Sequence, residues 1–240
     1  MSQIKRSRTP LILVNFKTYI EATGKSGVEL AKIADKVSRD SGVTIAVAPQ
    51  FTDLKTVTEA VEIPVFSQHI DPIKPGAYTG HVLADAVKAA GASGTILNHS
   101  ERRIKISEIE EILSLARVSD LASVVCTDTP GVSAAVASLS PDMIAIEPPD
   151  LIGTGVAVSK ARPELITNAI KRIRSVNDSV DILCGAGVST AEDVGKALEL
   201  GTRGVLVSSS VVKGTNPGQL LENMTDEVLR SKQEFFKVSG

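Results

Sequence analysis

Eight short apolar runs, distributed along the chain of 240 residues, constrain its fold more than any other feature. The runs are rich in Val and Ile and do not alternate with polar residues, which is typical of strands buried on both faces. They cover residues 11–14, 43–48, 63–66, 94–97, 122–126, 143–146, 180–184 and 204–207. We therefore predict eight buried strands.

Segments with helical spacing separate these runs. Ile109, Ile112, Leu113 and Ala116, for example, recur at the three- and four-residue spacing of one helix face. Further helical patterns cover residues 161–176, 191–200 and 220–238. Two capping boxes are expected, at Ser107 with Glu110 and at Ser189 with Glu192, and glycines suited to a left-handed helix end follow three of the patterns, at Gly42, Gly91 and Gly201.

Strand–helix alternation predicts an α/β fold with a parallel sheet and right-handed crossovers. Eight such units in this length favour a single (β/α)8 TIM barrel with a parallel eight-stranded core, and we expect residues 1–240 to form one domain. An open doubly wound sheet is the alternative. The dinucleotide-binding fingerprint that would favour it is missing.

Composition excludes several classes of partner. The formal net charge of −2 gives no electrostatic reason to expect nucleic acid or an anionic membrane. The two cysteines, Cys126 and Cys184, lie far apart and have no metal-ligand spacing, which favours a reducing compartment and no bound metal. Since no run approaches the roughly 18 apolar residues of a membrane span, we expect a cytoplasmic protein.

The chemistry of such barrels collects at the carboxyl ends of the strands, where this chain places few reactive side chains. Asn15 and Lys17 follow the first run, His99 the fourth and Glu147 the sixth. A carboxylate at a strand end could act as a general base, and a neutral imidazole beside free amides could donate to a carbonyl oxygen. The alternatives are an internal ion pair for Lys17, a structural role for His99 and a solvated surface position for Glu147. His69 and His81 are expected to be structural or surface residues.

Small residues follow the seventh and eighth runs, in Gly185-Ala-Gly187 and Ser208-Ser-Ser210. They would let a phosphate approach backbone amides closely. Prolines after Glu147 and glycines at positions 153 and 155 suggest a lid that is stiff at one end. Together these features predict proton abstraction next to a carbonyl on a small phosphorylated substrate, without cofactor or metal.

The same motifs resemble one enzyme family along essentially the whole chain. Asn15-Phe-Lys17, Gly76-Ala-Tyr-Thr-Gly80, Asn98-His-Ser-Glu-Arg-Arg103, Ile146-Glu-Pro148 and Ile152-Gly-Thr-Gly155 are similar, in order and spacing, to the triosephosphate isomerase family. The amino-acid sequence around Glu147 and the segment Cys184-Gly-Ala-Gly187 resemble the archaeal type of that family.

The resemblance implies a role for each matching position. Glu147 would move the proton, His99 would polarise the carbonyl as a neutral electrophile, Lys17 would offset the enediolate charge, and Asn15 would position substrate oxygens. Ile152 would close over the base, and backbone amides of Gly153, Gly187, Ser208 and Ser209 would hold the phosphate. The substrate-binding set implied in this way is Asn15, Phe16, Lys17, Ile152, Gly153, Gly187, Ser208 and Ser209.

Three departures from the family pattern bear on phosphate affinity and on the lid. Gly187 stands where many members have serine, Ser208-Ser209 where many have two glycines, and the chain has no tryptophan. The resemblance also implies a homo-oligomer, dimer or tetramer, in which Thr79 contacts the neighbouring subunit and Glu101 supports the site. For Glu101, a helix-start carboxylate is the alternative.

The expected reaction is the interconversion of dihydroxyacetone phosphate and D-glyceraldehyde 3-phosphate in glycolysis and gluconeogenesis. Two alternatives are kept: a different sugar-phosphate isomerase or epimerase, and a barrel that binds a phosphorylated metabolite without turning it over. A metal-dependent epimerase would need His and Asp ligands at several strand ends, which this sequence lacks.

Overall fold

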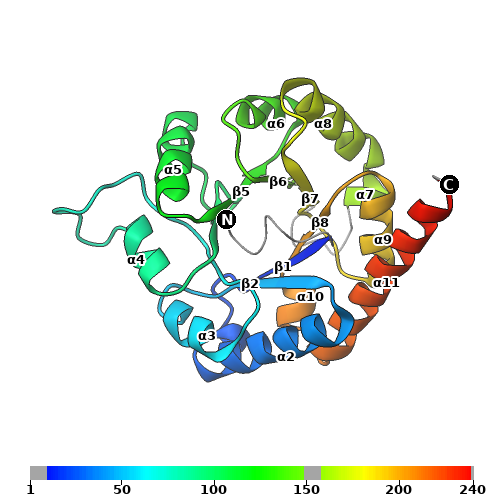
Figure 1. Cartoon of the computed structure of the whole chain (residues 1–240), viewed down its shortest axis with the longest axis horizontal. Coiled ribbons are helices and arrows are strands. Elements are labelled where there is room, and N and C mark those ends of the chain that lie inside the picture. The colour runs from blue at the N-terminus through cyan, green and yellow to red at the C-terminus, as the bar shows by residue number, and fades with distance from the viewer. Residues whose placement is uncertain (1–9, 149–157, 239–240) are drawn as a thin grey trace.

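Strands and helices alternate along the chain in the structure, a computed structural model that describes residues 10–148 and 158–238 (Figure 1). The strands are β1 (Leu11–Asn15), β2 (Thr44–Ala48), β3 (Phe66–Ser67), β4 (Gly94–Leu97), β5 (Ala122–Thr127), β6 (Met143–Ile146), β7 (Asp181–Cys184) and β8 (Gly204–Val207). The helices are η1 (Ile20–Ala22), α2 (Lys25–Ser41), α3 (Leu54–Ala60), α4 (Ala84–Ala89), α5 (Ile106–Val118), α6 (Pro130–Ala137), α7 (Val158–Ala161), α8 (Pro163–Val176), α9 (Ala191–Glu199), α10 (Ser209–Val212) and α11 (Pro217–Val238).

The strands form one parallel sheet in the order β2-β1-β8-β7-β6-β5-β4-β3. Its two outer strands meet through a parallel bridge between Val47 and Val65, and the Val47 N–H donates to the carbonyl oxygen of Pro64 at 3.1 Å. The sheet therefore curls into a barrel, and Figure 1 shows helices arranged around it. The predicted (β/α)8 barrel is confirmed, and the open doubly wound sheet was the wrong alternative.

Two separate apolar cores follow from the two faces of each strand. Inward side chains such as Leu13, Val124 and Met143 fill the barrel interior. Outward side chains such as Ile12 and Ile144 pack against the surrounding helices in a larger core. This alternation matters for function, because it determines which residues at the strand ends face the mouth of the barrel.

Two predicted elements depart most from the prediction. The third run, predicted at residues 63–66, forms only the two-residue strand β3, with Val65 contributing the single bridge that closes the barrel. The helix predicted at residues 161–176 begins instead at Pro163, as α8, and Ala161 is the last residue of the separate short helix α7. Pro163 occupies the first turn of α8, and a residue before proline is restricted away from helical backbone, so Arg162 (φ −144°, ψ 61°) interrupts the pattern.

Both predicted capping boxes were misplaced. Helix α5 begins at Ile106, where the Lys105 N–H donates to the Glu108 carboxylate at 2.7 Å, so Ser107 lies inside the helix. Helix α9 begins at Ala191, as the pattern predicted, but Thr190 and not Ser189 is the cap, and its hydroxyl accepts from the Asp193 N–H. The glycine ends were predicted correctly: Gly42, Gly91 and Gly201 have φ of 70°, 96° and 98°.

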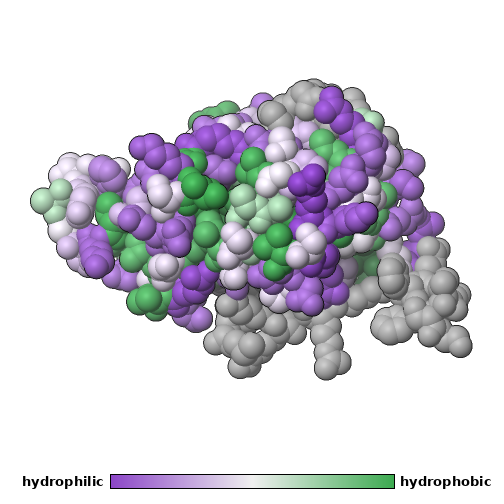
Figure 2. Space-filling view, turned by 90° about the horizontal axis from the view of Figure 1, so that it is seen from above, coloured by the Kyte–Doolittle hydropathy of each residue, from purple (hydrophilic) through white to green (hydrophobic). Residues whose placement is uncertain are grey.

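The segment between β3 and α4 projects from the barrel and carries the half-exposed Tyr78 (Figure 1). Figure 2 shows a face on which hydrophilic and hydrophobic residues are mixed. In the described part of the chain, no helix combines the length and the apolar character needed to cross a bilayer.

Candidate active site

The carboxyl ends of the strands surround a pocket that collects most of the predicted site residues. Its lining comprises Asn15, Lys17, Tyr19, His99, Glu147, Gly185, Gly187, Val188, Ser189, Leu206, Val207, Ser208, Ser209 and Ser210. The side chains suited to proton transfer come from the loops after β1, β4 and β6, whereas the small residues follow β7 and β8. The barrel therefore brings together segments that are far apart in the sequence.

Glu147 is the most buried ionisable group of this pocket, with 1% of its surface exposed. It continues the inward series of Met143 and Ala145, which explains why its side chain faces the barrel mouth. Burial raises the pKa of Glu147 to about 7, although hydrogen bonds from the Cys126 thiol and the Ser100 amide partly oppose that shift. At neutral pH the carboxyl can thus both accept and release a proton.

Directly after β7, the backbone at Gly185 lies so close to Glu147 that it leaves no room for a side chain. A Cβ on Gly185 would lie 2.7 Å from Cγ of Glu147 and 3.2 Å from the carbonyl oxygen of Ile146. Glycine at this position therefore allows the carboxylate to lie directly against the end of the neighbouring strand.

His99 lies beside the carboxylate, with its Nε2 3.4 Å from Oε1 of Glu147. Its Nδ1 accepts a hydrogen bond from the Glu101 N–H at 3.2 Å, so we assign the hydrogen of the neutral ring to Nε2. Burial, followed by the charge of Lys17, lowers the pKa of His99 to about 4. The imidazole is thus neutral at pH 7 and presents a donor towards the pocket.

The neutral state of His99 was predicted, but for a different main reason. No helix begins at Ser100: residues 100–102 form a turn, and α5 begins at Ile106. A backbone amide does meet the ring, but burial and a neighbouring cation are the larger causes of the low pKa. The interpretation of Glu101 as a helix-start carboxylate was wrong for the same reason.

Lys17 reaches the pocket from the loop after β1. Its ammonium lies 2.8 Å from Oε1 of Glu101, and its backbone N–H donates to Oδ1 of Asn15 at 2.9 Å. The Lys17 side chain is 12% exposed, whereas that of Glu101 is 57% exposed. Lys17 thus forms an ion pair, as one alternative expected, and also lines the pocket. Because its partner, the Glu101 carboxylate, is exposed to water, the Lys17 ammonium can still interact with a second anion.

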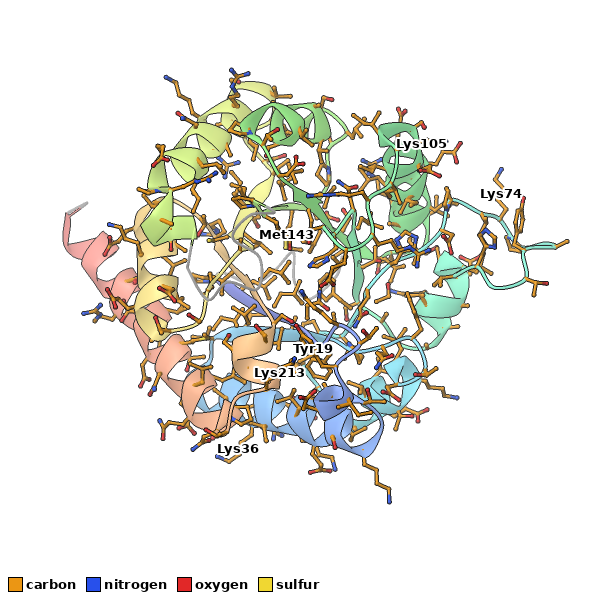
Figure 3. All side chains as sticks on the ribbon, turned by 180° about the vertical axis from the view of Figure 1, so that it is seen from behind. Tyr19, Lys36, Lys74, Lys105, Met143 and Lys213 are labelled. Atoms are coloured by element: carbon orange, nitrogen blue, oxygen red, sulfur yellow. The ribbon has the colours of Figure 1, made fainter. Side chains whose placement is uncertain are left out.

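Two loops of small residues also line the pocket. Gly187 has a φ of 71°, in the left-handed region that favours glycine. Ser208 donates through its hydroxyl to the carbonyl oxygen of Asn15 at 2.8 Å, which ties the loop after β8 to the end of β1. At the rim, the Lys213 ammonium lies 4.1 Å from the centre of the Tyr19 ring (Figure 3). This cation–π contact joins the loops after β1 and β8.

Comparison with known proteins identifies the family. A family model described as triosephosphate isomerase matches residues 10–224. The chain belongs to the triosephosphate isomerase family. Three relatives carrying that name come from methanogenic archaea, as the predicted archaeal type requires.

These relatives match this family member along nearly their whole length. The protein of Methanocaldococcus jannaschii is 50% identical over 214 residues, which is 89% of this chain and 98% of the relative. That of Methanothermus fervidus is 49% identical over 219 residues, 91% of this chain and 99% of the relative. That of Methanosarcina mazei is 48% identical over 216 residues, 90% of this chain and 97% of the relative.

Several predicted site residues do not line the pocket. The Phe16 side chain is fully buried in the core between strands and helices. Thr79 is exposed on the projecting segment, and Ile152 and Gly153 lie outside the described residues. His69 is buried beside Asp71, with 3.1 Å between Nε2 and Oδ1, in keeping with the structural role expected of it. Among the described residues, no group of three or more His, Cys, Asp or Glu could hold a metal ion.

Sequence reasoning missed two residues that contact the carboxylate, Cys126 and Gly185. Cys126 was considered only as a possible disulfide or metal ligand. Its place in β5, two residues after the inward Val124, would have indicated that its thiol faces the barrel mouth. Gly185 was interpreted only as part of a phosphate loop, because the steric limit set by Glu147 depends on how two neighbouring strands are placed.

Proposed function

We propose that this chain interconverts dihydroxyacetone phosphate and D-glyceraldehyde 3-phosphate, the reaction of its family, in glycolysis and gluconeogenesis. The observation that carries the proposal is one pocket holding a buried carboxylate with a pKa of about 7 beside an imidazole with a pKa of about 4. A Glu base paired with a neutral His is the pattern known for this family. The small residues of the loops after β7 and β8 line the same pocket and would let a phosphate approach their backbone amides.

Glu147 acts as the base in this proposal. It takes the proton from the carbon next to the substrate carbonyl and returns it to the neighbouring carbon, and the enediolate is the intermediate. A pKa near the working pH suits a group that must be basic in one step and acidic in the next. The low hydration of a carboxylate with 1% exposure supports this role, because a desolvated carboxylate binds a proton more tightly.

His99 and Lys17 stabilise the developing charge. The Nε2 hydrogen of His99 forms hydrogen bonds to the substrate oxygens, and the proton that leaves the hydroxyl oxygen passes by way of this ring to the oxygen of the former carbonyl. The Lys17 ammonium offsets the negative charge that forms on these oxygens. Asn15 helps to position those oxygens. The hydrogen bond from the backbone N–H of Lys17 to Oδ1 of Asn15 supports this arrangement, since it fixes the Asn15 side chain against the loop that carries Lys17.

The phosphate is held by backbone amides of Gly187, Ser208 and Ser209, and Phe16 contributes through its backbone between Asn15 and Lys17. The left-handed φ of Gly187 and the tie between Ser208 and Asn15 support this part of the proposal. Gly153 supplies a further amide and Ile152 covers the base, in the segment outside the described residues.

We also propose one domain over residues 1–240, a homo-oligomer, either dimer or tetramer, and a cytoplasmic location. In the oligomer, Thr79 on the projecting segment contacts a neighbouring subunit, and Glu101 supports the site through its ion pair with Lys17. The exposure of that segment supports the first contact. Two buried, unpaired cysteines are compatible with a reducing compartment.

The test is an isomerisation assay coupled to an auxiliary enzyme, run with a chelator and repeated with Glu147→Asp. We expect wild-type turnover that survives the chelator and a loss of at least about a hundredfold in kcat when the carboxylate is withdrawn by one methylene. The exposed Glu59→Asp serves as the matched control and should leave kcat unchanged. Absence of wild-type turnover would contradict the proposal and favour the barrel that only binds a phosphorylated metabolite. Turnover abolished by the chelator would contradict a metal-free reaction and favour a metal-dependent sugar-phosphate isomerase.

A further inference from the structure

The direction in which His99 points cannot be explained by the strand that precedes it. In β4, Ile96 faces the barrel interior and Leu97 faces the surrounding helices. If the extended backbone continued, residue 98 would face inward and residue 99 outward, away from the pocket. The observed His99 lies at the barrel mouth, so the alternation must be broken at Asn98.

Asn98 breaks it by adopting a left-handed conformation, with a φ of 54°. Asparagine is one of the few residues other than glycine that tolerate this region, because its short side chain can hydrogen-bond locally. Asn98 is also buried, so its side-chain amide needs partners within the protein.

Both ends of that amide are bonded. Nδ2 donates to the carbonyl oxygen of Cys126 at 2.9 Å, and Oδ1 accepts from the Ile104 N–H at 3.0 Å. The carbonyl oxygen of Asn98 also accepts a hydrogen bond from Nη1 of Arg103 at 2.8 Å. Asn98 is thus fixed on one side to β5 and on the other to the segment leading into α5.

The hydrogen bonds of the Asn98 amide, which we call the amide clamp, connect His99 with Glu147. On one side, Asn98 directly precedes His99. On the other side, Cys126 presents its carbonyl to Asn98 and its thiol to Glu147. The separation of 3.4 Å between the imidazole and the carboxylate is therefore spanned by a continuous chain of covalent and hydrogen bonds through Asn98.

We propose that Asn98 is a positioning residue for the isomerisation: its left-handed backbone turns His99 into the pocket, and its side-chain amide fixes the imidazole relative to Glu147. Asn98 does not line the pocket and acts only through its neighbours. The inference rests on the proposed function, since it assigns a role within the proposed proton transfer.

The test separates the side chain from the backbone. Asn98→Gly keeps access to the left-handed conformation but removes the amide clamp, and Ser140→Gly is the matched control. Ser140 has nearly the same φ, 55°, and its hydroxyl accepts from Asn177, but it lies at the opposite end of the barrel, before β6. We expect Asn98→Gly to lower kcat at least about tenfold while KM changes less than about threefold, because the phosphate loops after β7 and β8 are untouched.

A structural signature accompanies the kinetics. The ¹⁵N chemical shifts of His99 should show a single neutral form with the hydrogen on Nε2 in the wild type and a mixture of the two tautomers in Asn98→Gly. Unchanged kcat and an unchanged His99 spectrum in a folded Asn98→Gly protein would overturn the inference. A loss of kcat equalled by Ser140→Gly would overturn it as well, because that loss would follow from general destabilisation.

If Asn98→Gly does not fold, a second variant tests the same inference. Asn98→Asp retains tolerance of the left-handed region and an acceptor for the Ile104 N–H, but loses the donor to Cys126. The same split between kcat and KM is expected, and its absence would count against the inference. If the wild type itself shows no isomerisation, the proposed function fails, and the His99 spectrum alone still tests the positioning role.

Discussion

Replacing Glu147 by Gln should stabilise the fold while abolishing most of the turnover. The pKa of the buried carboxyl is about 7, compared with an ordinary value of 4.5. A difference of about 2.5 corresponds to about 3 kcal/mol, at about 1.4 kcal/mol per pKa unit. This free energy is the amount by which the folded state disfavours the charged carboxylate, and glutamine, which has the same shape and no charge, does not carry that cost.

The sign of the pH dependence follows from the same values. The unfolded chain releases the proton near pH 4.5 and the folded chain only near pH 7, so the wild type loses stability as pH rises between these values. Below that window Glu147 is protonated in both states and resembles glutamine. The gain from Glu147→Gln should therefore be small at pH 4.5, increase through the window and reach about 3 kcal/mol at pH 8 to 9.

Urea unfolding at a fixed protomer concentration measures this gain, since association also contributes to apparent stability. The exposed Glu59→Gln serves as the control and should change the free energy of unfolding by less than about 0.5 kcal/mol at every pH. A gain that is equal at pH 5 and pH 9, or absent at pH 9, would refute the argument that burial of the charge raises the pKa.

Three further predictions concern turnover. The kcat/KM of the wild type should rise with pH through about 7 as Glu147 ionises, and His99 should add no titration above about pH 4, which a pH–rate profile measures. Cys126→Ala removes a hydrogen bond that lowers the Glu147 pKa, so the rising limb of that profile should move to higher pH; an unmoved limb would argue against the thiol contact. Gly185→Ala would place a Cβ 2.7 Å from Cγ of Glu147, and steady-state kinetics should show kcat lowered at least about tenfold with a smaller change in KM.

Much of the barrel was predictable because buried parallel strands leave a strong signal. Runs such as 143–146 and 204–207 coincide with β6 and β8, since strands covered on both faces need apolar side chains at every position. The short β3 was not predictable in the same way. Its run is as apolar as the others, but within residues 63–65 the pairing is reduced to the single bridge of Val65 with Val47, and pairing between strands is a property of the tertiary structure.

The site residues likewise include some that the sequence predicted and some that it did not. Asn15 and Glu147 were predicted from their places after apolar runs, and in the structure both continue the inward series of their strands. Gly185 was overlooked in its steric role, because the contact of its backbone with Glu147 depends on how closely two strands approach each other. Sequence patterns report the direction of a side chain within one strand but not the distance between neighbours.

A left-handed backbone conformation explains why the strand pattern alone did not predict the direction of His99. Among the described residues, the non-glycine positions with positive φ include Lys17 at 49° and Asn98 at 54°, both at the mouth of the barrel. Such a conformation costs about 1–2 kcal/mol per residue and persists where surrounding contacts hold it, often at functional sites. Here the contacts are visible: Lys17 is fixed by Asn15 and Glu101, and Asn98 by Cys126 and Ile104. The regular alternation of the strands thus places Asn15 and Glu147 at the barrel mouth, and the break in it at Asn98 turns His99 towards that carboxylate.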